Sequence, residues 1–229
     1  MKRMLCVLAL LSLCLLPVGA EEGETKYIAL TFDDGPSGRF TTALLDGLAE
    51  REVHATFFLC GYRVEQFPTL TARISAEGHE IGSHSDRHQF MNEQSAAGVC
   101  ADLRAAEETI TQAAGKRPTL LRPPGGIYST AVLRETCCAD LPVILWSVDP
   151  HDWCRSDVDG IVQDVTKCAR NGDIILMHDM SDSSVQAALR IIDALEARDF
   201  EFVTVSELAY LAGQSLNGCE SYHSFPSAK

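Results

Sequence analysis

Apolar runs alternate with amphipathic stretches along most of this 229-residue chain. Short apolar runs rich in β-branched and aromatic residues predict seven strands, at 27–32, 53–59, 79–83, 119–121, 143–148, 174–177 and 200–205. Apolar residues at helical spacing predict helices at 40–51, 64–76, 93–114, 130–137, 158–170, 185–197 and 207–211. The longest helix would carry Leu103, Ala106 and Ile110 on the side that packs against a core.

The repeated order of strand and helix predicts the fold class. Nearly continuous apolar strands separated by helices are typical of an α/β protein, whose parallel sheet is a barrel or a doubly wound sheet. Seven units in about 190 residues are fewer than the eight units and ~250 residues of a typical barrel. We therefore predict a single domain built as a distorted (β/α) barrel of about seven parallel strands.

The two ends of the chain lack this alternation. Residues 1–20 have a basic start, an apolar run and a small-residue end, which is the layout of a cleaved export signal. An uncleaved anchor is the alternative, but the apolar run is shorter than the ~20 residues that span a bilayer. We predict a signal peptide at 1–20, a short lead at 21–26, the domain at 27–212 and a loosely held tail at 213–229. The protein would then be secreted, periplasmic or attached to the cell wall, without stable membrane insertion.

Acidic residues outnumber basic ones, and the formal net charge is −13. Without Lys2 and Arg3 the mature chain would have 17 basic and 32 acidic residues, a net charge of −15. Such a surface repels polyanions, so nucleic acid and anionic lipid are not expected partners. No Walker loop, dinucleotide fingerprint or G-x-S-x-G elbow is present, so no nucleotide is expected either. We expect a monomer.

An odd number of cysteines would remain after the signal is removed: Cys60, Cys100, Cys137, Cys138, Cys154, Cys168 and Cys219. In an exported chain such a count predicts disulfides, with at least one thiol left over or paired with another chain. None of them has C-x-x-C spacing, so we interpret them as structural and not as metal ligands. The tail would be pinned, if at all, through Cys219.

Five clusters of polar or unusual residues each follow a predicted strand. They are Asp33-Asp34-Gly35-Pro36, His84-Ser85-Asp86-Arg87-His88, Arg122-Pro123-Pro124-Gly125-Gly126, Asp149-Pro150-His151-Asp152-Trp153 and His178-Asp179. The carboxyl ends of parallel strands open onto one face of an α/β fold. We therefore expect the five clusters to converge there.

The second cluster has the spacing of a metal site. His84 and His88 stand at i and i+4, which would place both imidazoles on one side of a helical turn. With one carboxylate, from Asp33 or Asp34, they would hold a divalent metal with an open coordination position, as in a catalytic zinc site. Because side chains of adjacent residues in extended backbone point to opposite sides, one aspartate would bind metal and the other act as base.

Two more clusters supply groups for hydrolysis. His178 could give a proton to a departing amine if a carboxylate, Asp149 or Asp152, raised its pKa. Arg122 precedes two prolines and so lies on a stiff, extended backbone, from which it could orient a carboxylate by bidentate hydrogen bonding.

Taken in order, the clusters resemble the five motifs of the polysaccharide deacetylases with a NodB homology domain, carbohydrate esterase family 4. The similarity extends over residues 26–212. It implies that Asp33 is the catalytic base and that zinc, or alternatively cobalt, is held by Asp34, His84 and His88. A distorted (β/α) barrel is also the fold that the resemblance implies.

The resemblance implies further roles. Arg122 would position Asp33, Asp149 would pair with His178, and His178 would be the general acid. The pocket for the acetyl methyl group would be lined by Trp153 and Leu176. The family usually has an aromatic residue where this chain has Gly125, whose backbone N–H can still stabilise an oxyanion. Because this side chain is missing, we expect the sugar to be bound differently at this side of the cleft than in typical members of the family.

Together these features predict an enzyme that removes N-acetyl groups from an acetylated polysaccharide partner. N-acetylglucosamine or N-acetylmuramic acid in peptidoglycan or a chitin-like glycan is the expected substrate. One alternative is an esterase that removes O-acetyl groups from xylan, since ester and amide hydrolysis pass through similar oxyanions. The other is a non-catalytic sugar-binding module, which would have no need to keep both aspartates and three histidines.

Overall fold

The computed structural model describes residues 25–129, 134, 140–218 and 220–226. Four parallel strands form the centre of the fold, in the spatial order β3 (Glu80–Ser83), β2 (Thr56–Leu59), β1 (Lys26–Asp33) and β5 (Ile174–His178). The amino-terminal end of β1 also pairs with β6 (Phe200–Phe202). A separate parallel pair is formed by β4 (Val143–Ile144) and β7 (Ser221–Tyr222).

Isolated parallel bridges extend the sheet beyond these ladders. Leu121 bridges Ser83 at the end of β3 and Val143 in β4, and Val148 bridges Ile175 in β5. The parallel segments therefore follow one another around the molecule, although no continuous ladder closes the ring within the described residues. This arrangement confirms the predicted α/β class and agrees with a distorted barrel.

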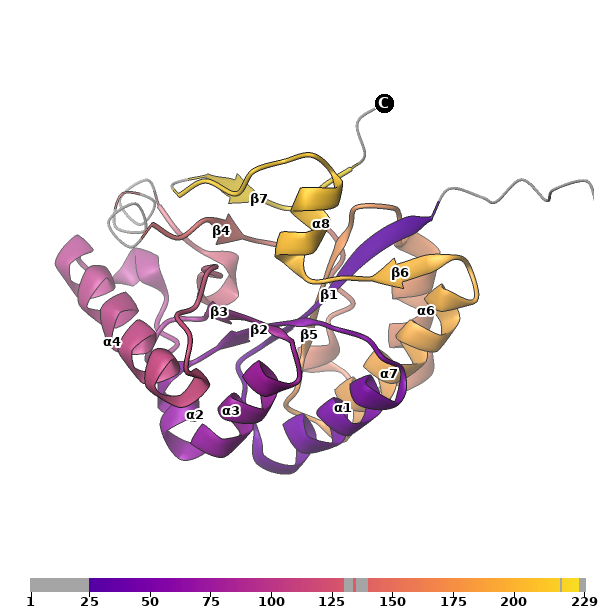
Figure 1. Ribbon diagram of the computed structural model, residues 1–229, viewed down its shortest axis with the longest axis horizontal. Helices are drawn as coiled ribbons and strands as arrows, with labels where there is room; N and C mark the ends of the chain where they lie inside the picture. Colours follow the sequence, from indigo (N-terminus) through magenta and orange to yellow (C-terminus); the bar gives the residue numbers. More distant parts are fainter. Residues whose placement is uncertain (1–24, 130–133, 135–139, 219, 227–229) are drawn as a thin grey trace, which may run out of the picture.

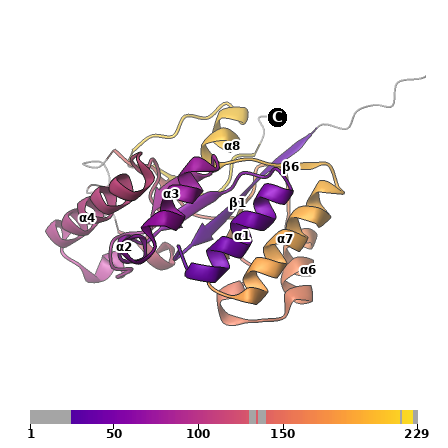
Figure 2. The same ribbon diagram turned by 60° about the horizontal axis from the view of Figure 1, so that its bottom comes forward.

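Helices cover the outside of the sheet. They are α1 (Gly38–Glu50), α2 (Gly61–Gln66), α3 (Pro68–Ala76), α4 (Ala96–Ala114), α6 (Val158–Cys168), α7 (Asp182–Glu196) and α8 (Val205–Leu211). Figure 1 shows α1 to α4, α6 and α7 in an arc along one side, with α8 on the other side beside β4 and β7. In Figure 2 helices α1, α7 and α6 lie side by side.

Local sequence signals explain where several helices begin and end. The Ser95 side chain accepts a hydrogen bond from the Gly98 N–H and caps α4, which ends before Gly115 at a φ of 72°. One helix was predicted over 64–76, but the structure has two, because Pro68 has no N–H to continue α2 and instead begins α3. The predicted helix at 130–137 falls outside the described residues, apart from Arg134.

Several predicted strands are shorter than expected, among them 53–59, which begins only at Thr56. The stretch 119–121 contributes only the two isolated bridges of Leu121, and 143–148 forms a ladder only at Val143 and Ile144. Strand β6 stops at Phe202 because Thr204 and Glu207 form a capping box that begins α8. Apolar character alone did not reveal these ends, since a buried irregular segment is as apolar as a strand.

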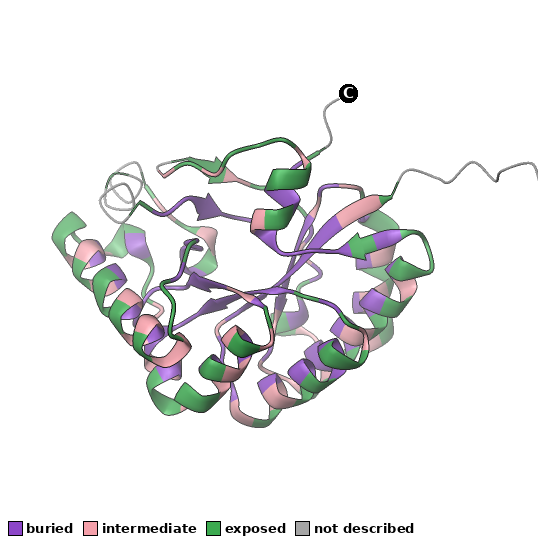
Figure 3. Ribbon diagram, in the orientation of Figure 1, coloured by how far each residue is buried: buried purple, intermediate pink, exposed green. Residues whose placement is uncertain are grey.

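The buried side chains of β1 alternate between two apolar clusters. Ile28, Leu30 and Phe32 belong to the main core, which also includes apolar residues of α1, α6 and α7. Ala29 points the other way, into a second cluster with residues of α8 and Phe225. Figure 3 shows that the central strands are buried and that the helices are exposed on their outer sides. The central strands are thus fixed on both faces, and so are their carboxyl ends.

The carboxyl-terminal segment is packed, contrary to the prediction of a loosely held tail. Strand β7 pairs with β4, and the Phe225 ring is buried and stacked on Tyr222 with centroids 5.4 Å apart. The Phe225 N–H also donates to the Gly172 carbonyl (2.7 Å). The prediction failed because a few separated aromatic residues can anchor a segment that shows no periodicity.

The structure describes four cysteines, all as free thiols: Cys60, Cys100, Cys154 and Cys168. The disulfides expected from the cysteine count are therefore not found among these four. Cys60 is buried with its Sγ 3.6 Å from the His84 carbonyl oxygen. Cys137, Cys138 and Cys219 lie outside the described residues. No helix in the described part of the chain is long and apolar enough to cross a membrane.

Candidate active site

Strand ends bring the predicted functional side chains together. Asp33 ends β1 and pairs in register with His178, which ends β5. His84 directly follows β3, and Arg122 directly follows the bridge at Leu121. Since these segments are parallel, the side chains that follow them meet at one edge of the sheet, as the sequence predicts.

Asp34, His84 and His88 form a cluster with the geometry of a metal site. Asp34 Oδ1 lies 3.4 Å from His84 Nε2 and 3.0 Å from His88 Nε2. One potential ligand atom from each residue lies within 4.8 Å of the other two. Two imidazoles and one carboxylate leave at least one coordination position open on zinc or a similar cation.

Hydrogen bonding within the cluster indicates that a cation belongs there. His84 Nδ1 lies 2.7 Å from the Arg122 carbonyl oxygen, which can only accept, so the proton of a neutral imidazole is on Nδ1. The lone pair on Nε2 then faces Asp34 Oδ1, which is buried and has no hydrogen-bond partner among the described residues. Two lone pairs this close require a shared proton or a metal ion between them. The donor set therefore fits a divalent cation.

Charge around the cluster favours an ionised carboxylate. Burial raises the pKa of Asp34, but His84 and His88 outweigh burial and hold it well below its ordinary value. The Asp34 carboxylate also raises the pKa of His88, although burial acts against this. A metal ion bound in place of a proton would benefit from the same negative charge.

The two histidines lie in a loop and not on a helical turn, contrary to the prediction from their spacing. Ser85 and His88 both have left-handed backbone, with φ of 68° and 55°, and Ser85 Oγ accepts a hydrogen bond from the His88 N–H (2.9 Å). Asp102 in α4 supports the same loop, because its carboxylate accepts from the N–H groups of Asp86 (2.9 Å) and Arg87 (3.2 Å). No sequence signal points to Asp102, which is one of three acidic residues in α4.

Asp33 is held apart from the cluster by Arg122. The fully buried Arg122 donates from Nη1 to Asp33 Oδ1 (2.8 Å) and to Thr31 Oγ1 (2.7 Å). Its Nε and Nη2 donate to the carbonyls of Ile144 (3.1 Å) and Leu145 (2.9 Å). The expected bidentate pair is therefore absent, since only one nitrogen is left for the carboxylate. The guanidinium is nevertheless fixed on all sides and positions Asp33.

His178 pairs with Asp152 and not with Asp149, which corrects the pairing that the family resemblance implied. Asp152 Oδ1 lies 2.9 Å from His178 Nδ1, and its Oδ2 accepts the His178 N–H (2.9 Å). Asp149 Oδ1 instead accepts the N–H of His151 (2.8 Å). Burial lowers the pKa of His178, but the bond to Asp152 and the nearby acidic charges outweigh it and raise the pKa to about 9.

These groups open onto one cavity of about 360 Å³. The metal cluster, Asp33 and His178 line it, together with Gly125, Trp153 and Leu176, the three residues expected to contact substrate. Asp149 lines it as well. Two aromatic residues that the sequence did not single out, Phe90 and Trp146, complete the wall. The candidate metal ligands, the candidate base and the candidate acid therefore lie in one cavity beside apolar side chains.

Asp179 supports the turn that carries Asp34. The Asp179 carboxylate accepts a hydrogen bond from Thr41 Oγ1, and its backbone carbonyl accepts one from Ser37 Oγ. A Cβ atom at Gly35 would lie 2.6 Å from Asp179 Oδ1, so only glycine allows this close approach. Burial raises the pKa of Asp179 to about 6.

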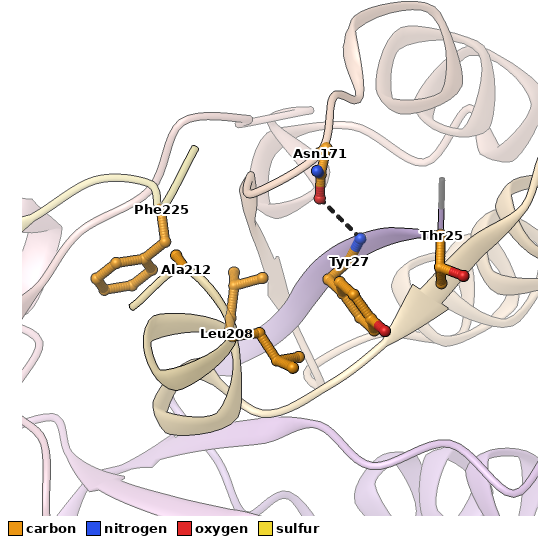
Figure 4. Close-up of a pocket in the computed structure, with 7 residues that line it drawn as sticks. Thr25, Tyr27, Asn171, Leu208, Ala212 and Phe225 are labelled. Atoms are coloured by element: carbon orange, nitrogen blue, oxygen red, sulfur yellow. Dashed lines mark hydrogen bonds between the residues drawn. The ribbon is translucent and has the colours of Figure 1, made fainter. Parts of the chain in front are cut away.

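A second cavity, of about 280 Å³, lies far from this chemistry in the fold. Figure 4 shows it between β1 and α8, with Tyr27, Leu208 and Phe225 in its wall and the Tyr27 N–H donating to Asn171 Oδ1 (2.8 Å). None of the described residues that line it is a histidine, cysteine or carboxylate. It therefore offers no group for metal binding or acid–base catalysis.

Two bacterial deacetylases are similar in sequence to most of the chain. A peptidoglycan-N-acetylglucosamine deacetylase of Bacillus cereus is 39% identical over 188 residues, covering 80% of this chain and 88% of that protein. The peptidoglycan-N-acetylmuramic acid deacetylase PdaC of Bacillus subtilis is 41% identical over 184 residues, which are 80% of this chain but only 38% of that longer protein.

A solved structure shares the fold. The family 4 acetyl xylan esterase of Clostridium thermocellum, in complex with a cobalt ion, has a TM-score of 0.82 and 32% identity, covering 88% of this chain and all (100%) of that chain. The protein family described as polysaccharide deacetylase matches residues 20–143. These matches agree with the order of the five clusters and with the site that they form. The chain therefore belongs to the polysaccharide deacetylases, the enzymes of carbohydrate esterase family 4.

Proposed function

We propose that this enzyme is a metal-dependent hydrolase that removes N-acetyl groups from N-acetylglucosamine or N-acetylmuramic acid units of peptidoglycan or a chitin-like glycan. The observation that carries the proposal is the cluster of the buried His84 with the half-buried Asp34 and His88, which opens onto the same cavity as Asp33 and His178. The names of the Bacillus relatives support the choice of an N-acetylated cell-wall glycan.

Asp34, His84 and His88 would hold the metal, for which zinc is our first choice and cobalt the second. Nitrogen and oxygen ligands in this number suit either ion. Once bound, a divalent cation would polarise the acetyl carbonyl and lower the pKa of water at the site. The cobalt in the similar esterase structure supports the choice of a divalent ion.

Asp33 would act as the base that takes a proton from the attacking water. Its Oδ1 accepts a hydrogen bond from the buried Arg122, which leaves Oδ2 for the proton. Asp33 Oδ2 lies 3.7 Å from His84 Nε2, so the base stands next to the metal ligands without being one of them. Arg122 thus acts through Asp33 as a positioning residue.

His178 would give its proton to the departing amine. With a pKa of about 9 it is protonated at neutral pH, as an acid must be before the C–N bond breaks. Asp152 holds the Nδ1 side of the ring, so the proton for the amine would come from Nε2. Gly125 would offer its backbone N–H to the oxyanion, and the acetyl methyl would lie against Trp153 and Leu176.

Removal of O-acetyl groups from xylan is the second candidate function. The similarity to an acetyl xylan esterase favours it, and the same base, acid and metal ligands would serve ester hydrolysis. An amine leaving group needs a proton more than an alcohol does, so the protonated His178 favours the amide substrate.

Acetate release distinguishes these functions. The purified enzyme would be assayed on chitin oligomers, peptidoglycan and acetylated xylan, each with and without a chelator. We expect acetate from at least one of the N-acetylated glycans, loss of activity with chelator, and recovery on adding zinc or cobalt. Release from xylan alone would favour the esterase, and no release from any of the three would contradict both candidates.

We also propose that the enzyme works outside the cytoplasm, as a monomer. The proposal rests on the predicted signal at 1–20, which lies outside the described residues, and on the cell-wall substrates named for the relatives. Cell fractionation of the full-length chain, followed by light scattering of the exported form, would test it.

A further inference from the structure

Two apolar side chains beside Gly125, a residue of the cavity wall, are exposed to solvent, as is Trp153 (62%) in the same wall. Phe90 is 40% exposed and Ile127 is 42% exposed, although both are large enough to be buried elsewhere. Phe90 lines the same cavity as the metal cluster and His178. Exposed apolar side chains beside a site of chemistry mark a surface that binds another molecule.

Gly125 makes room for the Phe90 ring. A Cβ atom on Gly125 would lie 3.0 Å from Phe90 Cε1 and 3.7 Å from Ile127 Cδ1, so the two side chains flank the space that a residue 125 side chain would fill. The left-handed φ of Gly125 (62°) also disfavours any larger residue there. The Phe90 ring thus stands where a side chain of residue 125 would otherwise reach the rim.

The loop that carries Phe90 is anchored on both sides. His88, two residues before, belongs to the metal cluster, and Met91, immediately after, is buried in an apolar cluster with residues of α4. Phe90 is therefore exposed although its neighbours are fixed. An aromatic ring held in this way can stack on a flat apolar face without losing much conformational freedom.

We infer that Phe90 is a specificity-determining residue that binds a second sugar ring of the glycan, next to the ring that loses its acetyl group. This inference rests on the proposed function. A pyranose ring has polar edges, but the C–H groups on its faces are apolar and fit an exposed aromatic ring. The occupant belongs to the same chain as the reacting sugar, because Phe90 and the catalytic groups share one cavity.

Four variants and two kinds of substrate test this role. Phe90→Ala removes the ring, Phe90→Leu keeps an apolar side chain without an aromatic face, and Phe90→Trp keeps a face. Tyr210→Ala is the control, since Tyr210 is an exposed aromatic (82%) on α8, which is outside the cavity. The substrates are N-acetylglucosamine oligomers of two to six units, and 4-nitrophenyl acetate, an ester without a sugar.

We expect Phe90→Ala and Phe90→Leu to lower kcat/KM on the longer oligomers about tenfold, mainly through KM. Phe90→Trp should stay within about threefold of the wild type, and Tyr210→Ala should match it. A fall of the same size on the small ester would indicate damage to the metal loop and would overturn the inference. So would a Phe90→Leu variant as efficient as the wild type.

The result also separates this inference from the function on which it rests. A wild type that releases acetate from glycans while Phe90→Ala has an unchanged KM would refute only the role of Phe90. A wild type that releases no acetate from any glycan would refute the proposed function, and the role of Phe90 with it.

Discussion

Asp33 and Asp34 are adjacent in sequence but lie in different surroundings. Asp33 is the last residue of β1 and accepts a hydrogen bond from a buried guanidinium, whereas Asp34 has left-handed backbone (φ 70°) and faces two imidazoles. This turn of the chain places the two carboxylates in separate surroundings, which suits the two roles that we propose for them. The sequence predicted the division, because adjacent side chains cannot point to one place.

We expect Asp33→Asn to lower kcat at least about 100-fold, because the amide cannot accept the proton of water. The variant should still bind one equivalent of zinc, measured by metal analysis after dialysis. Asp34→Asn is the matched comparison and should lose most of the metal. If Asp33→Asn were the variant without metal, the assigned roles of the two aspartates would be wrong.

The partner of His178 could not be predicted at the residue scale. Asp149 and Asp152 both follow the fifth predicted strand, and spacing does not reveal which carboxylate turns toward the histidine. The local backbone determines the partner. His151 has left-handed backbone (φ 57°), and the short helical turn Asp152–Cys154 that follows it brings the Asp152 carboxylate to the backbone N–H and the ring Nδ1 of His178.

The pH dependence of activity tests this pairing. We propose the protonated His178 as the acid, and kcat should then fall as pH rises through its pKa of about 9. Asp152→Asn removes the charge that raises this pKa, so the alkaline fall should move toward the ordinary histidine value of about 6.5. Asp149→Asn should leave the position of the alkaline limb unchanged. The reverse result for the two variants would restore Asp149 as the partner.

At the scale of elements, long periodic segments were predicted well and loops were not. Helix α7 and strand β5 lie within a few residues of their predicted bounds. A helix buried on one side has apolar residues at helical spacing, and a strand buried on both faces is a continuous apolar run, so both are recognisable in the sequence. The metal loop was predicted as a helical turn, because i and i+4 spacing does not distinguish a turn of helix from a loop held by Ser85 and Asp102.

The support from α4 predicts an effect on metal affinity. Asp102→Asn replaces one of the two carboxylate oxygens that accept the Asp86 and Arg87 N–H groups. It should weaken zinc binding about tenfold, as the loss of a hydrogen-bonding group that supports metal ligands commonly does. A competitive zinc titration measures this without any turnover. Glu108→Gln, an exposed carboxylate on the same helix, is the control and should not change the affinity. Equal affinities for Asp102→Asn and the wild type would show that the loop needs no such support.

For the molecule as a whole, the β4–β7 pair and Phe225 attach the carboxyl-terminal segment to the rest of the fold. The α/β fold with parallel strands could be predicted from the alternation of strands and helices, but this attachment could not, because it depends on isolated aromatic residues. We expect Phe225→Ala to lower the free energy of unfolding by about 3–5 kcal/mol, measured with denaturant. Tyr210→Ala should cost less than about 0.5 kcal/mol. A loss below about 1 kcal/mol for Phe225→Ala would show that the segment contributes little.

Anomalous X-ray scattering from crystals of the zinc-loaded enzyme tests the central claim most directly. We expect one strong peak, about 2.0–2.2 Å from an Asp34 oxygen and from Nε2 of both His84 and His88. Asp33 should remain hydrogen-bonded to Arg122 and outside the bonding distance of the ion. A peak at another place, or none at this cluster despite bound zinc, would contradict the account.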